Sequence, residues 1–377
     1  MKILHTSDWH LGHTLYNYDR TVEQQAFLRQ LTRIVTEEQP DAMVVSGDIY
    51  HYSSPAAATQ KMYTDAMLNI HQACPEMTIV VTAGNHDSSS KLEIDSNLWQ
   101  HFGLNVVGNI ERTAEEVNLD KHIIEINNEK KTKGYVIAVP HVYPQNFPLL
   151  DTETPRDQRQ ARFFQALLDE VKKRNTAQLP VVLMAHLSIE GSDRSGHDES
   201  IGGIEYVPLS AMGEGYDYLA LGHIHCPQDI KGSHHHARYC GTPLPVSFDE
   251  TYPHSVSIIE LEKGAEPQIS TREIENPIPL VTLPHDPTPF EDALKLLEEY
   301  PEEKPAYLRL NVLTKGYLPP DCNEKASNAA KGKACKYCYI KTTRERQADT
   351  DESKPISIQE MQEMSPLEIA RLYYRET

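Results

Sequence analysis

Short apolar segments of this sequence run directly into residues that can bind a metal ion or transfer a proton. Residues 77–83, for example, predict a buried strand, and Gly84-Asn85-His86-Asp87 follows at once. The same arrangement recurs at five points along the chain, which supply Asp8, His10, Asp48, Asn85, His86, His186, His223 and His225. Carboxylates, an amide and imidazoles are suitable ligands for hard and borderline divalent cations.

This set of side chains suits a pair of divalent cations that activate water. Two cations about 3.5–4 Å apart need one ligand that bridges them, and a carboxylate oxygen does so well. The chain offers Asp48 as a single carboxylate at its strand end. Any one of the histidines alone would be interpreted as a surface residue or a hydrogen-bonded core residue. Five coincident strand ends favour the metal site over that alternative.

The composition bounds the size, surface and compartment of the protein. Its 377 residues exceed what one compact core usually holds, so one large domain with smaller additions is expected. The net charge of −19 would repel nucleic acid unless a local basic face or bound metal intervenes. The six cysteines lack disulfide spacing, which favours a reducing compartment. Without a signal peptide or a bilayer-spanning run, a cytoplasmic protein with no membrane contact is expected.

The order of predicted elements indicates an α/β fold. Buried strands are predicted over 2–6, 41–46, 77–83, 180–185 and 217–221, and helices over 19–38, 55–73, 90–101 and 156–173. The alternation of strands and helices at the start of the chain favours parallel strands with helices packed outside. The composition changes near residue 277. We therefore expect a large domain over 1–276, a small α+β domain over 277–347, a polar linker over 348–355 and a helical segment over 356–377.

The motifs Asp-x-His, Gly-Asp, Gly-Asn-His-Asp, a lone histidine after a strand and Gly-His-x-His occur in this order. This pattern resembles the calcineurin-like metallophosphoesterase superfamily. Residues 3–12, 218–225 and 238–250 further resemble the SbcD family of bacterial nuclease subunits within it. The resemblance implies an α/β fold with a two-sheet β-sandwich core flanked by helices, a small α+β capping domain and a C-terminal helix. It is strong up to about residue 260, and beyond 277 only the element order agrees.

The same resemblance implies roles for individual residues. It places one metal on Asp8, His10 and His225 and a second on Asn85, His186 and His223, with Asp48 bridging both. The two divalent ions are usually manganese in this family. His86 is expected to support the phosphate and to protonate the departing 3′ oxygen, as a histidine can near neutral pH. Asp87 is expected to orient a histidine, and His51 either contacts the phosphate or lies on the surface.

The resemblance implies a metal-dependent DNA nuclease subunit that works with an SbcC-like SMC-type ATPase. Its expected activities are 3′–5′ exonuclease cleavage of double-stranded ends and endonuclease cleavage of hairpins and single strands, during DNA replication, recombination and repair. A small-molecule phosphodiesterase or phosphatase with the same two-metal site is the alternative, because fold and metals do not fix the substrate. A non-catalytic scaffold is disfavoured because no ligand position is lost. The domain after residue 277 favours the nuclease, whereas the acidic charge favours the alternative.

Two apolar stripes and the last residues bear on assembly. The stripes comprise Met62, Tyr63, Ala66, Met67 and Ile70 on helix 55–73, and Leu98, Trp99 and Phe102 on the following helical segment. Each stripe could face the chain's own core or a second copy, and the resemblance favours a homodimer with a two-fold helical contact. Residues 365–374 predict a short apolar helix, which could dock onto its own domain or, as the resemblance favours, onto the ATPase.

Overall fold

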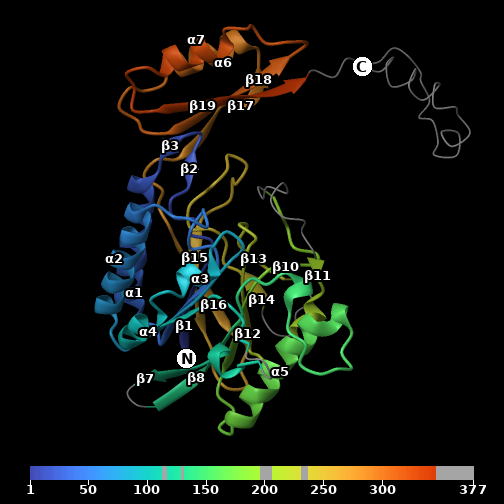
Figure 1. The fold of residues 1–377 in the computed structure, drawn as a ribbon. Coiled ribbons are helices and arrows are strands. Elements are labelled where there is room, and N and C mark those ends of the chain that lie inside the picture. Colours follow the sequence, from blue (N-terminus) through green and yellow to red (C-terminus); the bar gives the residue numbers. More distant parts are fainter. Residues whose placement is uncertain (113–116, 129–130, 196–205, 231–236, 345–377) are drawn as a thin grey trace, which may run out of the picture.

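The strands that precede the predicted ligands are buried on both faces, which explains their nearly continuous apolar sequences. A computed structural model describes residues 1–112, 117–128, 131–195, 206–230 and 237–344. Two six-stranded sheets pack face to face in the large N-terminal part of the chain (Figure 1). Alternate residues of the facing strands, such as Val44, Val80, Val182 and Ala220, form the apolar layer between the sheets.

The first sheet carries three of the five strand ends that the sequence singled out. Its strands are β1 (Lys2–Thr6), β4 (Ala42–Ser46), β5 (Thr78–Thr82), β6 (Leu104–Val107), β15 (Ser255–Glu260) and β16 (Gln268–Glu273). They lie in the order β16-β15-β1-β4-β5-β6, with β1, β4, β5 and β6 parallel and β15 and β16 antiparallel. Helices α1 (Thr21–Glu38) and α2 (Ala57–Ala73) cover its outer face.

The second sheet carries the other two strand ends. Its strands are β7 (Ile123–Asn128), β8 (Lys131–Ala138), β9 (Val181–His186), β12 (Tyr218–Gly222), β13 (Gln228–Asp229) and β14 (Ala237–Tyr239). They lie in the order β13-β14-β12-β9-β8-β7, with parallel central strands and antiparallel edges. Helix α5 (Arg159–Arg174) packs Phe163, Leu167 and Val171 onto its outer face. The expected two-sheet α/β sandwich is therefore confirmed.

Shorter elements connect these layers. They are β2 (Thr14–Leu15), β3 (Tyr18–Asp19), β10 (Ser188–Ile189), β11 (Tyr206–Val207), α3 (Ser89–Leu92), α4 (Ser96–Trp99) and several 3₁₀ turns. The continuous helix predicted over 90–101 is wrong, because the chain breaks between α3 and α4. At the break, the Glu93 carboxylate accepts hydrogen bonds from the backbone amides of Gly108 and Asn109 at 2.6 and 3.0 Å. Within the described ranges, no helix is both long enough and apolar enough to span a membrane.

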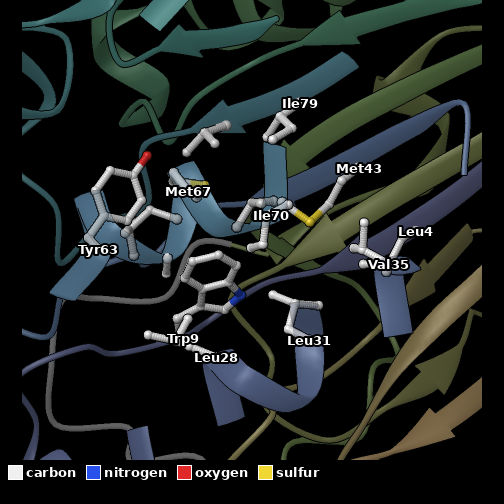
Figure 2. Close-up of a cluster of buried hydrophobic side chains, with 14 of the residues drawn as sticks. Leu4, Trp9, Leu28, Leu31, Val35, Met43, Tyr63, Met67, Ile70 and Ile79 are labelled. Atoms are coloured by element: carbon white, nitrogen blue, oxygen red, sulfur yellow. The ribbon is translucent and has the colours of Figure 1, made fainter. Parts of the chain in front are cut away.

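Trp9 anchors the loop that follows β1. Its ring packs among residues of α1, α2 and the first sheet (Figure 2), and its Nε1–H donates to Thr6 Oγ1 at 2.9 Å. The same cluster contains Tyr63, Met67 and Ile70 of α2. The α2 stripe that suggested a dimer contact therefore faces the chain's own core, which was the alternative interpretation.

Residues 280–344 form a separate α/β unit, hereafter the C-terminal unit. Its elements are β17 (Leu280–Thr288), α6 (Phe290–Glu298), β18 (Tyr307–Thr314), α7 (Cys322–Ala330) and β19 (Lys336–Arg344). The three strands are parallel, so the α+β arrangement expected for this region is wrong. Parallel neighbours need long crossovers, and the segments containing α6 and α7 provide them. Figure 1 shows this unit at one end of the molecule, over β2 and β3. The linker 348–355 and helical segment 356–377 lie outside the described residues.

A buried histidine makes the stability of the fold sensitive to acid. His122 is fully buried at the end of a 3₁₀ turn, and its Nδ1–H donates to the carbonyl oxygen of Ala138 at 2.7 Å. Its Nε2 has no hydrogen-bond partner in the structure. Burial lowers the pKa of His122 from 6.5 to about 4. The folded protein therefore binds fewer protons than the unfolded chain between these values, and stability falls as the pH drops below about 6.5.

We predict that His122→Gln removes this acid sensitivity. Between pH 7 and pH 5 the wild type should lose about 2 kcal/mol more unfolding free energy than the variant, because only the wild type must keep this imidazole neutral. Urea unfolding at both pH values measures the difference. His285→Gln, at a fully exposed site, is the control and should lose as much as the wild type. Equal losses in the wild type and His122→Gln would contradict the prediction.

Candidate metal centre

All eight predicted strand-end residues meet at one edge of the two sheets. Asp8 and His10 follow β1, Asp48 follows β4, Asn85 and His86 follow β5, His186 ends β9, and His223 and His225 follow β12. Strands β1, β4 and β5 are parallel to one another in the first sheet, and β9 and β12 are parallel in the second, so their carboxyl ends lie together in each sheet. The loops after parallel strands are the usual place for a site in such folds.

The loops turn sharply to bring the ligands inward. Asp8, His10 and Asp48 have φ angles of 53, 44 and 51°, and His223 has a φ angle of 99°. These values lie in the left-handed region of backbone conformation, which residues other than glycine rarely adopt. Backbone strain of this kind costs about 1–3 kcal/mol per residue and is characteristic of functional sites. Gly84 is required for a different reason, because an added Cβ would lie 2.1 Å from Asp48 Oδ1.

The metal-binding atoms converge within a few ångströms. Asp48 Oδ2 lies 3.4 Å from His186 Nε2 and 3.8 Å from His10 Nε2, so it stands between two groups of ligands. On one side, His10 Nε2 and His225 Nε2 are 3.2 Å apart. On the other side, Asn85 Oδ1 lies 2.9 Å from His186 Nε2 and 3.0 Å from His223 Nδ1. Three sets of side chains bring their ligand atoms close enough together to hold a metal ion, namely Asp8–His10–His225, Asp8–Asp48–His186 and His10–His51–His86.

The outer nitrogens of two imidazoles are already hydrogen-bonded, which directs the inner nitrogens toward the centre. His186 Nδ1 lies 2.8 Å from the carbonyl oxygen of Ser46, which can only accept, so Nδ1 carries the proton. His225 Nδ1 lies 2.9 Å from Glu250 Oε1 and donates to it in the same way. In each ring Nε2 is therefore the nitrogen that faces the other ligands, and once it carries no proton it can bind a metal. The donor set therefore fits two divalent cations.

Burial makes the charges at this site strongly interdependent. Asp8, His10, Asp48 and His186 are each at most 2% exposed. Burial favours the neutral carboxyl of Asp48, but the neighbouring His186 and His10 hold its pKa well below the usual range. In the opposite sense, burial disfavours a charged His186, yet Asp48 raises the pKa of that imidazole to about 9. A cation that binds His186 must therefore displace a proton.

His51 and His86 lie next to His10, with which they form one of the three sets that could hold a metal ion. The rings of His51 and His86 stack 5.2 Å apart, and His51 Nδ1 lies 3.3 Å from His10 Nδ1. His86 Nδ1–H donates to the carbonyl oxygen of His51 at 2.9 Å. Both residues line a cavity of ≈ 370 Å³ whose wall also contains Asp48, Asn85 and the three histidines at 10, 223 and 225. The structure thus places His51 at the site rather than on a remote surface.

The contacts of Asp87 differ from the expectation that it orients a histidine. Its carboxylate contacts no histidine among the described residues, and instead accepts hydrogen bonds from the backbone amides of Gly84, Ile49 and Tyr50 at 2.9–3.1 Å. These contacts join the loop after β5 to the loop after β4. Asp87 therefore fixes the backbone next to Asp48 and Asn85. Burial raises its pKa to about 6, with the Asp48 charge adding to the effect.

Sequence reasoning missed two residues at the site. Glu250 is 6% exposed and holds His225, but no strand end precedes it in the sequence. His13 lines the same cavity, and its ring lies 4.6 Å from that of His51. Burial, together with the nearby Arg20, lowers the pKa of His13 to about 2 and keeps it neutral. The sequence signal for His13 is its position three residues after His10, and that for Glu250 is its place at the end of the segment 238–250.

Two parts of the chain match known protein families. Residues 1–227 match the calcineurin-like phosphoesterase family, and residues 276–377 match a domain described as the type 5 capsule protein repressor C-terminal domain. The SbcD protein of Rhodobacter capsulatus, a subunit of the nuclease SbcCD, is 33% identical over 309 residues, which cover 79% of this chain and 75% of that protein. The chain belongs to the SbcD family of calcineurin-like phosphoesterases.

Other SbcD relatives extend the match to the whole chain. The SbcD protein of Escherichia coli K12 is 27% identical over 387 aligned positions, covering 100% of this chain and 92% of the relative. The SbcD protein of Bacillus subtilis is 31% identical, and the match covers 71% of this chain and 68% of the relative. The chain is accordingly a hydrolase of the phosphoesterase class, and divalent metal ions belong to its site.

We predict that Glu250→Gln weakens metal binding. A carboxamide cannot reproduce the charge that orients the His225 imidazole and raises its basicity, and loss of such a partner typically costs roughly 10–100-fold in metal affinity. Titration calorimetry with Mn²⁺ measures the change. Glu262→Gln, which alters an exposed residue after β15, should bind as the wild type does. An unchanged affinity in Glu250→Gln would show that Glu250 has no influence on the ligand.

Proposed function

We propose that this chain is the metal-dependent nuclease subunit of an SbcCD-type complex and cleaves DNA phosphodiester bonds at the described site. The observation that carries the proposal is the single carboxylate of Asp48 lying between two ligand groups, with His86 beside them. The SbcD relatives are named as nuclease subunits, which supports DNA as the substrate class. The expected reactions are exonuclease cleavage of double-stranded ends and endonuclease cleavage of hairpins.

The ligand groups divide as the family resemblance implies. Asp8, His10 and His225 form the metal-one group, Asn85, His186 and His223 form the metal-two group, and Asp48 serves both. We propose manganese as the ion in each. When bound, the two cations would neutralise charge on the phosphoryl oxygens and make a water molecule more acidic. The protein holds the ligands in place beforehand through Ser46, Glu250 and Asp87.

His86 acts on the leaving group. Its Nδ1–H is engaged by the carbonyl oxygen of His51, and its backbone amide donates to Asp48 Oδ1 at 2.9 Å. These two contacts fix the ring next to the bridging carboxylate and leave Nε2 to face the cavity. In its imidazolium form the ring carries a second proton on Nε2, which it donates to the departing 3′ oxygen, and the ring is left neutral. His51, stacked on His86, contacts the same phosphate.

Charge distribution helps to reconcile an acidic protein with a DNA substrate. The whole chain carries a net charge of −19, but residues 280–344 contain ten Lys and Arg against nine Asp and Glu. This C-terminal unit caps the end of the molecule where β2 and β3 lie (Figure 1). The unit is therefore less repulsive to a phosphate backbone than the remainder of the chain, which carries the excess of acidic residues. We propose that residues 277–347 are the capping domain that meets the DNA.

Assembly extends beyond the described residues. We propose an SbcC-like ATPase as the partner, a cytoplasmic location, and docking of residues 356–377 onto that ATPase. We also propose a homodimer. Because Tyr63, Met67 and Ile70 are buried internally, a contact between copies would use the exposed Ile94 and Leu98, which are 78 and 58% exposed.

One experiment separates the nuclease from a small-molecule phosphodiesterase. Mn²⁺-dependent cleavage of blunt and hairpin duplexes is compared with cleavage of bis-p-nitrophenyl phosphate, with and without the ATPase and ATP. The nuclease proposal expects DNA cleavage that the ATPase and ATP enhance. Cleavage of the small diester alone would favour the small-molecule phosphodiesterase alternative.

We predict that His86→Ser separates catalysis from metal binding. The variant should retain two Mn²⁺ per chain by elemental analysis, because His86 belongs to neither ligand group. Its DNA cleavage should fall roughly 10²–10⁴-fold, as is typical of a lost general acid. His225→Ala is the contrasting variant, since it should lose metal as well as activity. Loss of an ion from His86→Ser would contradict the assigned role.

Deletion of residues 356–377 tests the docking segment. The truncated chain should no longer co-purify with the ATPase, because the apolar helix predicted there would supply the contact. Its Mn²⁺-dependent cleavage of bis-p-nitrophenyl phosphate should be unchanged, because every proposed ligand lies before residue 226. Undiminished affinity for the ATPase, measured by biolayer interferometry, would exclude this segment as the docking element.

A further inference from the structure

A short loop joins the C-terminal unit to a proposed metal ligand. In this loop, residues 245–250, Glu250 Oε1 accepts the hydrogen bond from His225 Nδ1 at 2.9 Å. Glu250 Oε2 accepts from the backbone amide of Val246 at 3.2 Å, so its carboxylate also closes the loop on itself. Any displacement of residues 245–250 therefore moves the group that orients His225.

Arg309 of β18 holds the same loop from the other side. Its Nη1 donates to Asp249 Oδ1 at 2.8 Å, and its Nη2 donates to the carbonyl oxygen of Phe248 at 3.4 Å. The guanidinium also lies over the Phe248 ring, 5.1 Å from the centroid. Arg309 is only 5% exposed. A buried guanidinium requires hydrogen-bond partners, and the half-exposed Asp249 carboxylate is the acidic one, which Lys341 also contacts at 3.3 Å.

A second buried contact between the C-terminal unit and the large domain ends at the start of the same loop. Tyr307 Oη donates to Glu23 Oε1 at 2.7 Å, and Arg20 Nε donates to the same oxygen at 3.3 Å. Arg20 Nη1 then donates to the carbonyl oxygen of Pro245 at 2.7 Å. The C-terminal unit thus fixes residues 245–250 at both ends.

The two proposed ligand groups differ in how they are connected to the C-terminal unit. The described contacts of His186 run to Ser46, Asn85 and Asp48, all within the two-sheet part of the chain. Asn85 is reached by His186 and His223. The metal-one group, in contrast, is reached from Arg309 by a direct path of contacts, from Arg309 to Asp249 and from the adjacent Glu250 to His225. A disturbance of the C-terminal unit should therefore act on one group and spare the other.

We propose that Arg309 and Asp249 are positioning residues for metal one, because they hold Glu250 against His225 from the C-terminal unit. The inference rests on the proposed ligand groups. It makes the C-terminal unit a structural part of the metal centre in addition to its role toward DNA. The unit then sets the affinity of one metal and leaves the affinity of the other unchanged.

The test is a Mn²⁺ titration of full-length Arg309→Met, followed by calorimetry and electron paramagnetic resonance. His225→Ala and His186→Ala identify which step of the wild-type titration belongs to metal one and which to metal two. We expect Arg309→Met to weaken the metal-one step about tenfold, at the lower end of the effects seen for indirect ligand partners. The metal-two step should be unchanged, and the signal of a coupled manganese pair should appear at higher Mn²⁺ concentration.

Matched variants separate positioning from general stability. Arg272→Met removes an arginine whose partner, Glu38, lies far from the loop, and should leave both steps unchanged. Arg309→Lys keeps the charge and should restore part of the metal-one affinity. Asp249→Asn changes a side chain that is 54% exposed and should fold in any case, with the same selective loss as Arg309→Met. In the double variant the two losses should not add, because both act through one contact.

The outcomes that overturn the inference are distinct from those that overturn the function. If the wild type binds two Mn²⁺ but Arg309→Met and Asp249→Asn leave the metal-one step unchanged, Arg309 does not position the ligand. Equal weakening of both steps would mean that Arg309 serves stability only. A wild type that binds fewer than two Mn²⁺ would instead refute the two-metal function on which the inference rests.

Discussion

The constraint on which this structure depends is the burial of two carboxylates among several imidazoles at one sheet edge. An unpaired charge in such a place is costly, so Asp48 and His186 stabilise each other's charged forms. Without metal, a proton on His186 supplies part of the positive charge. Divalent cations supply it better, because each can engage several of these groups at once. The site is thus incomplete as a purely protein structure.

The fold meets this constraint with two sheets instead of one. Asp48 follows a strand of the first sheet, whereas His186 ends a strand of the second. Asp48 Oδ2 and His186 Nε2 approach to 3.4 Å only because the two sheets pack face to face. The loops that complete the approach contain left-handed residues, including His223 with a φ angle of 99°. Trp9, anchored in the core between α1 and α2, keeps the loop bearing Asp8 and His10 in place (Figure 2). Core packing thereby supports strained backbone.

Sequence reasoning predicted which side chains meet at the sheet edge because their positions follow a local rule. A buried strand is recognisable from its apolar run, and a polar residue at its carboxyl end lies at a predictable edge. Glu250 obeys no such rule, since only the three-dimensional path of residues 245–250 brings it to His225. The role of Asp87 was missed for the same reason: its partners are backbone amides, which every residue except proline possesses. The edge strand β16 was not predicted because its exposed, polar residues show no apolar alternation.

The sequence pattern predicted the order of the elements in the C-terminal unit but not the parallel direction of its strands. In the order β17-β18-β19 the middle strand is β18, and its Arg309 is buried and contacts Phe248 and Asp249 of the large domain. An arginine there must find a carboxylate, and Asp249 is the one that it reaches. Asp249 stands next to Glu250 in the chain. The Arg309–Asp249 ion pair and the peptide bond between Asp249 and Glu250 therefore connect the C-terminal unit, proposed to meet the DNA, to the carboxylate that orients His225.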